Sequence, residues 1–456
     1  MTMSRLWRRT LVVTGVSMAA ALAGCGGGGG GGGGGDDDAP RAGTQAPPQC
    51  ADTGTCPAQG PVTLGGPPGS LCPAALDYST TFTGGSGAGE LVKLRFDTAA
   101  RTYQLEIIES PVPKQPGSVS PTRAGVTFTG TFANLTSLPT AEQNRCAVAL
   151  QTATASDGVS QATIDSARPP VIFLGNGVAG GGIPGATISY AGVLGLGAIP
   201  ATTFPFYPVL AFAQTEADFT RVAGTYNLLG YHQVPSGGAL TASSHFTPAT
   251  AQTTETLNAD GSCTTASGSC LSTGNNWKLR SADGAFESSN ADGSRRYPSF
   301  HNQAITASNA SRAKGLMVVG KLNGALVPLL VRTGYAQISL LPLTVNVDDE
   351  SGLALMAPAT TVASGRLDGG YIGSGSDFAY TASLVKGARV DLLDPMTMNQ
   401  TGGFQLDFTQ AAAGMVTTTD NSGTTGALIA SGRVFSHLSG TGGSSPTFRV
   451  GVLAAP

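Results

Sequence analysis

Residues 92–107 read VKLRFDTAARTYQLEI, and this stretch decides the fold class. Apolar residues alternate with basic ones at 92–96, and the alternation resumes with polar partners at 102–107. Successive residues of a strand face opposite sides of a sheet, so a period of two predicts two strands with one buried face. The break at 97–101 is short enough for a hairpin. The stretch therefore predicts an antiparallel hairpin.

The same pattern recurs along the chain. Residues 404–408 alternate as FQLDF, and residues 316–332 form two apolar arms around Asn323-Gly324, a residue pair typical of type I′ turns. Pro328 lacks an N–H, which places the second arm near a sheet edge or a bulge. Helical periodicity is nearly absent, with residues 141–151 as the one fair candidate. We expect an all-β, antiparallel body, sandwich- or barrel-like, in one or two units.

The composition excludes one class of partner. The 456 residues include 25 basic and 28 acidic ones, with a net charge of −3 and no basic run, so no nucleic-acid partner is expected. Of the 65 glycines, ten form the run 26–35, and the others recur along the chain as in proteins of many short strands and turns. No late apolar run is long enough to predict a membrane-spanning helix.

The N-terminus has the pattern of an export signal. Arg5, Arg8 and Arg9 precede an apolar segment at 11–23. The end of this segment leads into Leu22-Ala23-Gly24-Cys25. These four residues resemble the lipobox of bacterial lipoproteins, in which signal peptidase II cuts before the cysteine. The resemblance implies a signal peptide at 1–24 and a lipid on Cys25 that anchors the protein to a membrane. Residue 26 is Gly rather than Asp, which by the same resemblance favours the outer membrane of the cell envelope, on its periplasmic face or at the cell surface.

Residues 25–70 are expected to form a disordered tether. They contain ten successive glycines at 26–35 and then Pro- and Gly-rich sequence with little apolar content. A Gly-rich coil of this length has a root-mean-square reach of roughly 35–40 Å. We place an N-terminal β-rich domain at 71–220 and a C-terminal one at 221–456. A boundary at 357–365 is the alternative.

Six cysteines follow Cys25, and an even number after an export signal predicts disulfides. The six are Cys50, Cys56, Cys72, Cys146, Cys263 and Cys270. They allow 15 pairings. Proximity in the sequence favours Cys50–Cys56 and Cys263–Cys270, which leaves Cys72–Cys146. Neither close pair has the spacing usual for zinc ligands, so no metal site is predicted.

No motif predicts a catalytic site or a cofactor. Residues 175–180 match G-x-G-x-x-G, but Pro184 and further glycines follow where a dinucleotide site needs a helix. Ser-x-x-Lys at 311–314 and 383–386 lacks the other motifs of penicillin-binding enzymes. The four histidines are far apart, and the acidic run 348–350 has no calcium-loop pattern.

Residues 224–226, Gly-Thr-Tyr, loosely resemble the first strand of lipocalin-like barrels. The body otherwise resembles Gram-negative envelope lipoproteins of unassigned function. We expect a non-catalytic protein that binds a macromolecule, glycan or small ligand. An accessory subunit of an envelope assembly or transporter is the alternative, and an extracytoplasmic hydrolase or lipocalin-like binder is a further one.

Overall fold

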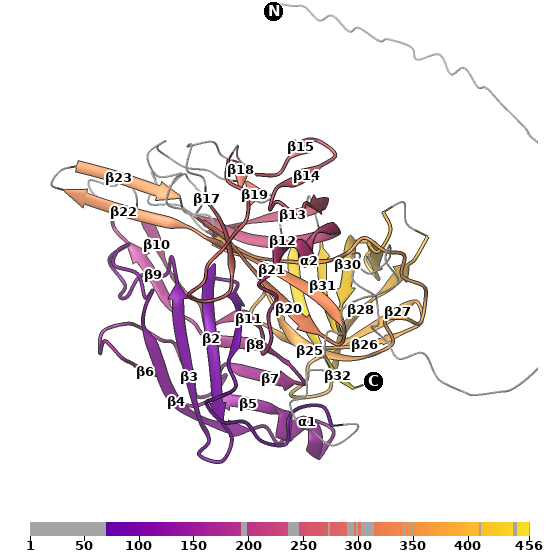
Figure 1. Cartoon of the computed structure of the whole chain (residues 1–456). Helices are drawn as coiled ribbons and strands as arrows, with labels where there is room; N and C mark the ends of the chain where they lie inside the picture. Colours follow the sequence, from indigo (N-terminus) through magenta and orange to yellow (C-terminus); the bar gives the residue numbers. More distant parts are fainter. Residues whose placement is uncertain are drawn as a thin grey trace, which may run out of the picture. The chain divides into compact units, whose positions relative to one another are not determined.

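The computed structural model describes an almost entirely β-stranded body (Figure 1). The described residues are 70–192, 198–235, 246–271, 274–289, 296–297, 300–301, 314–340, 343–348, 351–409, 412–440 and 445–455. Among them, no helix is both long and apolar enough to cross a membrane. The prediction of an all-β, antiparallel body is confirmed.

The first part is a barrel in which eight strands close on themselves through the β3–β4 pairing; we call it the N-terminal barrel. Its strands are β1 (Phe82–Ser86), β2 (Glu90–Asp97), β3 (Thr102–Glu109), β4 (Thr127–Asn134), β5 (Ala147–Leu150), β7 (Val171–Gly175), β8 (Val178–Pro184) and β11 (Phe206–Phe212). Attached to it are α1 (Ala141–Cys146), β6 (Thr154–Ala155), β9 (Thr187–Tyr190) and β10 (Ile199–Thr203).

The hairpin predicted at 92–107 is β2 and β3. Their register pairs Val92 with Ile107 and Leu94 with Leu105, and all four side chains are fully buried. Inside the barrel the ring of Phe96 packs edge-on against those of Phe82 and Phe132, with centroids 6.3 and 6.1 Å apart. Side chains therefore fill this part of the barrel, as in small closed barrels generally.

The second part is an open nine-stranded sheet, the central sheet. It follows α2 (Phe219–Val222) and contains β12 (Gly224–Pro235), β13 (Phe246–Leu257), β14 (Cys263–Thr265), β15 (Gly268–Ser269), β16 (Lys278–Leu279), β17 (Phe286–Ser289), β20 (Lys314–Leu322), β21 (Ala325–Thr333) and β24 (Ser351–Pro358). Two small hairpins accompany it: β18 (Arg296–Tyr297) with β19 (Phe300–His301), and β22 (Tyr335–Leu340) with β23 (Leu343–Asp348).

The hairpin expected around Asn323-Gly324 is β20 and β21. Both turn residues have positive φ, 51° and 76°, as a type I′ turn requires. The prediction that Pro328 marks an edge is only partly right, because β21 lies inside the sheet between β20 and β24. Its ladder with β24 begins one residue later, at Leu329, so Pro328 has no partner in that ladder.

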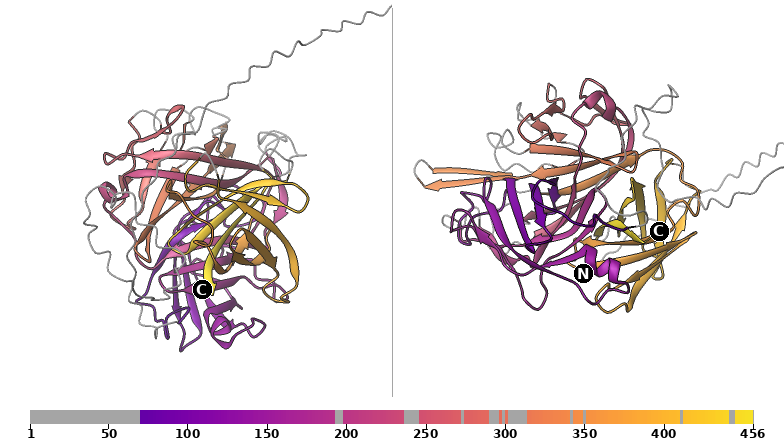
Figure 2. Two further views of the ribbon diagram at one scale, coloured as in Figure 1. Left: turned by 90° about the vertical axis from the view of Figure 1, so that its right-hand side faces the viewer. Right: turned by 60° about the horizontal axis from the view of Figure 1, so that its bottom comes forward.

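The third part is a second closed barrel, the C-terminal barrel, whose eight strands follow the chain order (Figure 2). Its strands are β25 (Gly369–Gly375), β26 (Tyr380–Lys386), β27 (Arg389–Leu393), β28 (Gln400–Asp407), β29 (Val416–Asp420), β30 (Thr425–Ser431), β31 (Val434–Ser439) and β32 (Thr447–Ala455). The pattern at 404–408 lies on β28, as predicted.

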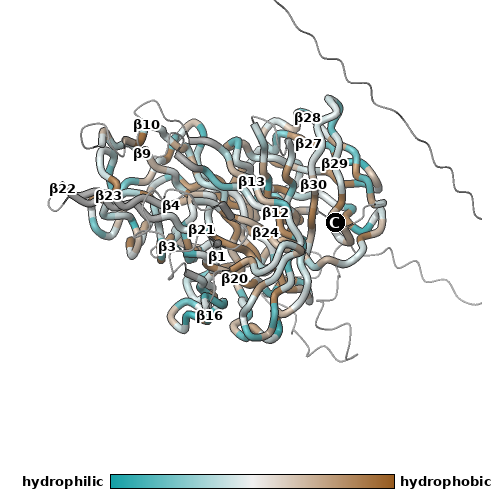
Figure 3. Tube along the Cα trace, turned by 90° about the horizontal axis from the view of Figure 1, so that it is seen from above, coloured by the Kyte–Doolittle hydropathy of each residue, from teal (hydrophilic) through white to brown (hydrophobic). Residues whose placement is uncertain are grey.

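One hydrophobic core joins the two barrels and the central sheet. It takes Phe212 from the outer face of the N-terminal barrel, Leu355 from the central sheet and Val434 from the C-terminal barrel. Hydrophobic colour is concentrated around β1, β20 and β24 (Figure 3). Gly320 permits this packing, because a Cβ there would collide with the ring of Phe212. The proposed domain division at residues 220 and 221 falls within α2 and stays a proposal.

Candidate functional site

An aromatic cleft lies where the three sheets meet, and it is the candidate site. Its empty volume is about 360 Å³, counting the part open to solvent. It is lined by Gly87, Tyr207 and Pro208 of the N-terminal barrel, by Tyr231, Gln233 and Leu353 of the central sheet, and by Ser376, Phe378 and Phe448 of the C-terminal barrel. Four of these nine residues are aromatic, and Gln233 and Ser376 add hydrogen-bonding groups.

Strand pairing brings these residues together. Tyr231 on β12 pairs directly with Leu353 on β24, so both face the same side of the central sheet. The turn between β1 and β2 is held against β11, because Gly87 N–H donates to the carbonyl of Pro208 at 2.7 Å. Two walls of the cleft are thus fixed by regular backbone hydrogen bonds.

The third wall is a turn with an unusual backbone. Phe378, between β25 and β26, has φ of +56°, a left-handed conformation that costs a residue with a side chain about 1–2 kcal/mol. Hydrogen bonds hold the turn: Ser376 N–H donates to the carbonyl of Phe448 at 2.8 Å, and Phe448 N–H donates to Ser376 Oγ at 3.0 Å. Asp377 also pairs with Arg449 at 2.8 Å. This turn therefore fixes the Phe378 ring in place despite the strain.

The Phe378 ring also packs on a cluster of aromatic rings. Its centroid lies 5.6 Å from that of Phe204 and 6.0 Å from that of Phe206, both in edge-on geometry. Phe206 stacks on Tyr380 of β26 at 4.6 Å, and the Tyr380 hydroxyl accepts a hydrogen bond from Val171 N–H at 2.7 Å. Burial raises the pKa of Tyr380, so its hydroxyl stays protonated. The cluster joins the two barrels behind the cleft.

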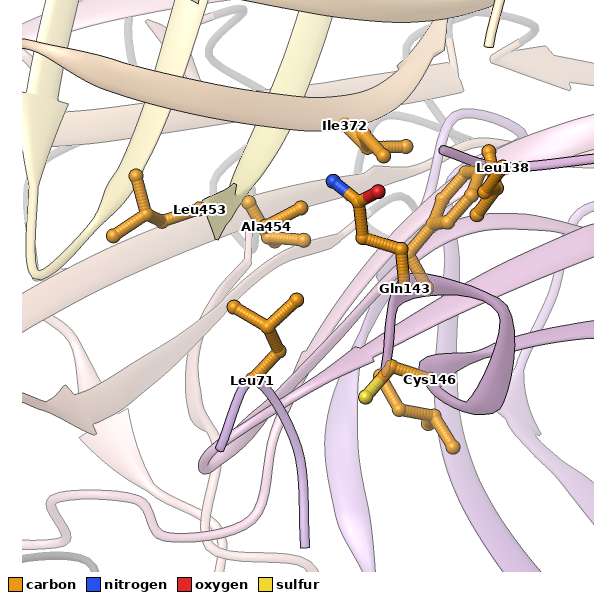
Figure 4. A pocket seen from close by; sticks show the side chains of 10 residues that line it. Leu71, Leu138, Gln143, Cys146, Ile372, Leu453 and Ala454 are labelled. Carbon is orange, nitrogen blue, oxygen red and sulfur yellow. The ribbon is translucent and has the colours of Figure 1, made fainter. Parts of the chain in front are cut away.

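A second pocket, with an empty volume of about 280 Å³ that counts space open to solvent, lies between α1, β7, β25 and β32. Figure 4 shows Gln143 of α1 among Leu71, Ile372 and Ala454. Its other lining residues are apolar apart from Cys146, which is in a disulfide. It offers a ligand fewer polar contacts than the cleft does, so we regard it as a packing gap.

Some of the predicted site residues lie among the residues that the structure describes. Leu22, Ala23, Gly24, Cys25, Cys50 and Cys56 lie outside the described residues. The structure joins Cys72 to Cys146 and Cys263 to Cys270, with Cα atoms 5.8 and 5.4 Å apart. Both pairs are ones that the sequence favoured. The Cys50–Cys56 pair stays a prediction.

A glutamate lies beside each disulfide. Hydrogen bonds from Arg145 lower the pKa of Glu142, next to Cys72–Cys146. Burial raises the pKa of Glu255, next to Cys263–Cys270, to about 8. The pKa values of the two carboxyl groups are therefore shifted in opposite directions.

Where the structure describes them, the other sequence motifs lie on strands and turns. Residues 175–180 span the end of β7, the turn at residues 176–177 and the start of β8, and no helix begins there, as the sequence indicated. Ser383 and Lys386 lie on β26, whereas Ser311 is outside the described residues. Gly224 begins β12, as expected for a strand, but β12 belongs to the open central sheet and not to a lipocalin-like barrel.

The histidines and the acidic run contribute little to a site. His232 and His437 are buried, the side chain of His301 is not described, and His245 lies outside the described residues. Asp348 ends β23, and residues 349–350 lie outside the described part of the chain.

Sequence reasoning missed the cleft. Tyr231, Phe378 and Phe448 stand in different parts of the chain, and no spacing rule connects them. The one available signal was Phe378 directly after the turn-forming sequence Gly-Ser-Gly-Ser-Asp at 373–377, since large apolar residues are uncommon in tight turns.

Residues 102–452 match a family described as "Protein of unknown function (DUF2957)". No curated protein matches the chain. Two structures of the vaccine antigen Transferrin Binding Protein B (TbpB) from Haemophilus parasuis Hp5, a double and a single mutant, align at 11% and 10% identity, each with a TM-score of 0.19. Each alignment covers 79% of this chain and 65% of that chain, so this chain spans less than two thirds of their length. At that TM-score the likeness carries no argument about fold or function.

Proposed function

The chain belongs to the family of proteins of unknown function DUF2957, and from its own residues we propose a lipid-anchored, non-catalytic binding protein of the cell envelope. In this proposal Cys25 carries the lipid, residues 26–70 form the tether, and the aromatic cleft receives an apolar side chain of a partner protein. The partner lies in the envelope or at the cell surface.

The backbone of Phe378 is the observation that carries the binding role. Strained conformations persist where the surrounding structure enforces them, and they are concentrated at binding and active sites. Here hydrogen bonds hold the strained turn, and the turn places an aromatic ring in the wall of a cleft. A glycine at position 378 would adopt this backbone conformation without strain. The presence of phenylalanine there therefore indicates that the ring has a role in the cleft.

The lining suits a protein partner. Binding energy in protein interfaces is concentrated in a few large side chains that fill apolar pockets. The cleft is open to solvent, so such a side chain can reach its aromatic lining. Gln233 and Ser376 can orient the neighbouring backbone through hydrogen bonds.

Site-specific photocrosslinking in cells that make the full chain tests this proposal. A photoreactive amino acid replaces Gln233 in the cleft, and in a control it replaces Leu384 on β26, whose side chain is 45% exposed. We expect a discrete protein adduct from position 233 and none from position 384. An accessory subunit of an assembly would give this adduct in stoichiometric yield.

The substitution Phe378→Gly supplies the decisive comparison. It removes the ring and relieves the backbone strain, so the adduct should be lost, and circular dichroism checks that the variant remains folded. Met398→Gly is the matched control, because Met398 also has positive φ, 57°, and is not among the cleft residues. An adduct that survives Phe378→Gly, or that forms equally at both probe positions, would refute the cleft as the binding site.

A further inference from the structure

Two clusters in the described residues each combine a disulfide with a glutamate. In one, the carboxylate of Glu142 lies beside Cys72 and Cys146, and in the other Glu255 lies beside Cys263 and Cys270. Within each cluster, one carboxylate oxygen and both Sγ atoms lie within 4.8 Å of one another. The two clusters therefore have the same composition and can be compared.

Glu142 has a clear structural role. Its carboxylate accepts hydrogen bonds from Arg145 at 2.7 and 2.8 Å and from Leu71 N–H at 3.0 Å. Its side chain is 35% exposed, so water completes its solvation. These contacts fasten α1 to the start of the body and explain why a glutamate stands there.

Glu255 has no such role. The residue is 2% exposed, and its Oε1 is buried with no hydrogen-bond partner. Its Oε2 lies 3.5 Å from Cys263 Sγ, and a disulfide sulfur carries no hydrogen to donate. Leu257, Leu271 and the two cysteines belong to the apolar cluster around it. An unpartnered buried carboxyl is costly and rare, so this one calls for an explanation.

We propose that Glu255, Cys263 and Cys270 are the ligands of a thiophilic divalent cation such as Zn²⁺, which binds after the Cys263–Cys270 disulfide has been reduced. Two thiolates and a carboxylate are a donor set that zinc accepts in proteins. The six residues between the two cysteines exceed the usual zinc spacing, which is why the sequence did not predict the site. Strand pairing supplies the proximity instead, since β14 begins at Cys263, opposite Leu257 of β13.

The chemistry balances with a dithiol as the reductant. The dithiol gives up two electrons and two protons and becomes a disulfide, while Cys263 and Cys270 each gain an electron and a proton and become thiols. The cation then displaces the protons of both thiols and any proton on the carboxyl group. Its two positive charges offset two of the three negative charges of the ligands, and it supplies the partner that the Glu255 carboxyl lacks in the disulfide form.

Cobalt titration of the mature chain with Cys25→Ser tests the site. The protein is reduced with dithiothreitol, freed of the reagent without oxygen and titrated with Co²⁺, whose thiolate complexes absorb in the near ultraviolet. We expect one equivalent bound with thiolate absorption in the reduced protein and none in the oxidised one. Zn²⁺ should displace the Co²⁺. Circular dichroism of the reduced protein checks that it remains folded.

Three variants identify the ligands. Glu255→Gln keeps both thiols and should weaken Co²⁺ binding at least tenfold, and Cys270→Ser should abolish the site. The control is the Cys72→Ser, Cys146→Ser double variant, which removes the other cluster and should bind as the parent protein does. Absence of thiolate absorption in the folded, reduced protein would overturn the proposal. Equal affinity of the Glu255→Gln variant would also overturn it.

Discussion

At the scale of single residues, the buried ion pair between Glu90 and Arg123 has a large expected effect on stability. Both side chains are fully buried, and Arg123 Nε and Nη2 donate to the two carboxylate oxygens at 2.6 and 2.7 Å. Ser110 Oγ donates to Glu90 Oε1 at 2.6 Å. Removing one partner of such a pair leaves an unpaired buried charge. Glu90→Gln should therefore lower the free energy of unfolding by about 3 kcal/mol.

Urea denaturation of the purified protein measures this loss. Glu106→Gln is the matched control, because Glu106 pairs with Arg95 at 3.4 Å with side chains 36% and 25% exposed. Exposed pairs contribute less than about 1 kcal/mol. Similar losses in the two variants would contradict the assignment of Glu90–Arg123 as a dry, well-bonded pair.

The lowered pKa of the buried His437 predicts how the stability of the fold depends on pH. Burial lowers its pKa to about 3, and the charge of Arg449 acts in the same direction. Its Nε2 lies 2.9 Å from Thr418 Oγ1, and its ring stacks on Phe404 at 4.1 Å. An unfolded histidine titrates near pH 6.5, so below that pH the unfolded chain binds more protons than the folded one.

Stability from the neutral His437 is thus complete above about pH 6.5 and falls as the pH drops toward 3. His437→Gln keeps a polar group for Thr418 and removes the titration. Thermal melts at a series of pH values should show a smaller loss for this variant than for the wild type between about pH 7 and pH 4. Parallel loss in both proteins would mean that other groups control the acid sensitivity.

At the scale of elements, the sequence predicted best those strands that have one buried face. The alternation at 92–107 became β2 and β3 because one side packs inside the barrel while Lys93, Arg95 and Gln104 remain partly exposed. Strand β7 reads VIFLG and is buried along its whole length, because its two faces contribute to different cores. Such a run cannot be distinguished from other buried segments by periodicity.

The two described disulfides should differ in what they contribute. Cys72–Cys146 closes a loop with a sequence separation of 74, and Cys263–Cys270 one of 7. Loop-closure entropy in the unfolded chain predicts about 4.5 kcal/mol for the long loop and about 2.5 kcal/mol for the short one. Paired Cys→Ala variants, compared by urea denaturation, should follow that order. A larger loss from the Cys263 and Cys270 pair would point to a role for that pair beyond loop closure.

At the scale of the whole molecule, the sequence could not predict how the sheets come together. The shared core is built from residues such as Phe212, Leu355 and Val434, which lie in different sheets and are far apart in the chain. The cleft forms at the same junction, so it was equally hidden. Local sequence patterns indicate which residues are buried, but they do not indicate which other residues those side chains contact. A site built from three sheets cannot be predicted without knowing these contacts.

The lipid anchor is the property of the whole molecule that the sequence predicts most sharply. Several acyl chains on Cys25 would hold the protein firmly at the membrane, since each buried methylene group contributes roughly 0.8 kcal/mol. Cys25→Ser removes the acylation site and leaves the rest of the chain intact. We expect the variant to move from the membrane fraction to the soluble fraction after cell lysis.

The Cys50→Ser, Cys56→Ser double variant is the control for that fractionation. It removes two cysteines of the tether without touching residues 22–25, so it should stay with the membranes. Labelling cells with a palmitate analogue gives a second readout, with label on the wild type and the control and none on Cys25→Ser. Membrane association of an unlabelled Cys25→Ser protein would contradict the lipid on Cys25 as the anchor, and it would assign the membrane contact to another part of the chain, such as a retained apolar segment at 11–23.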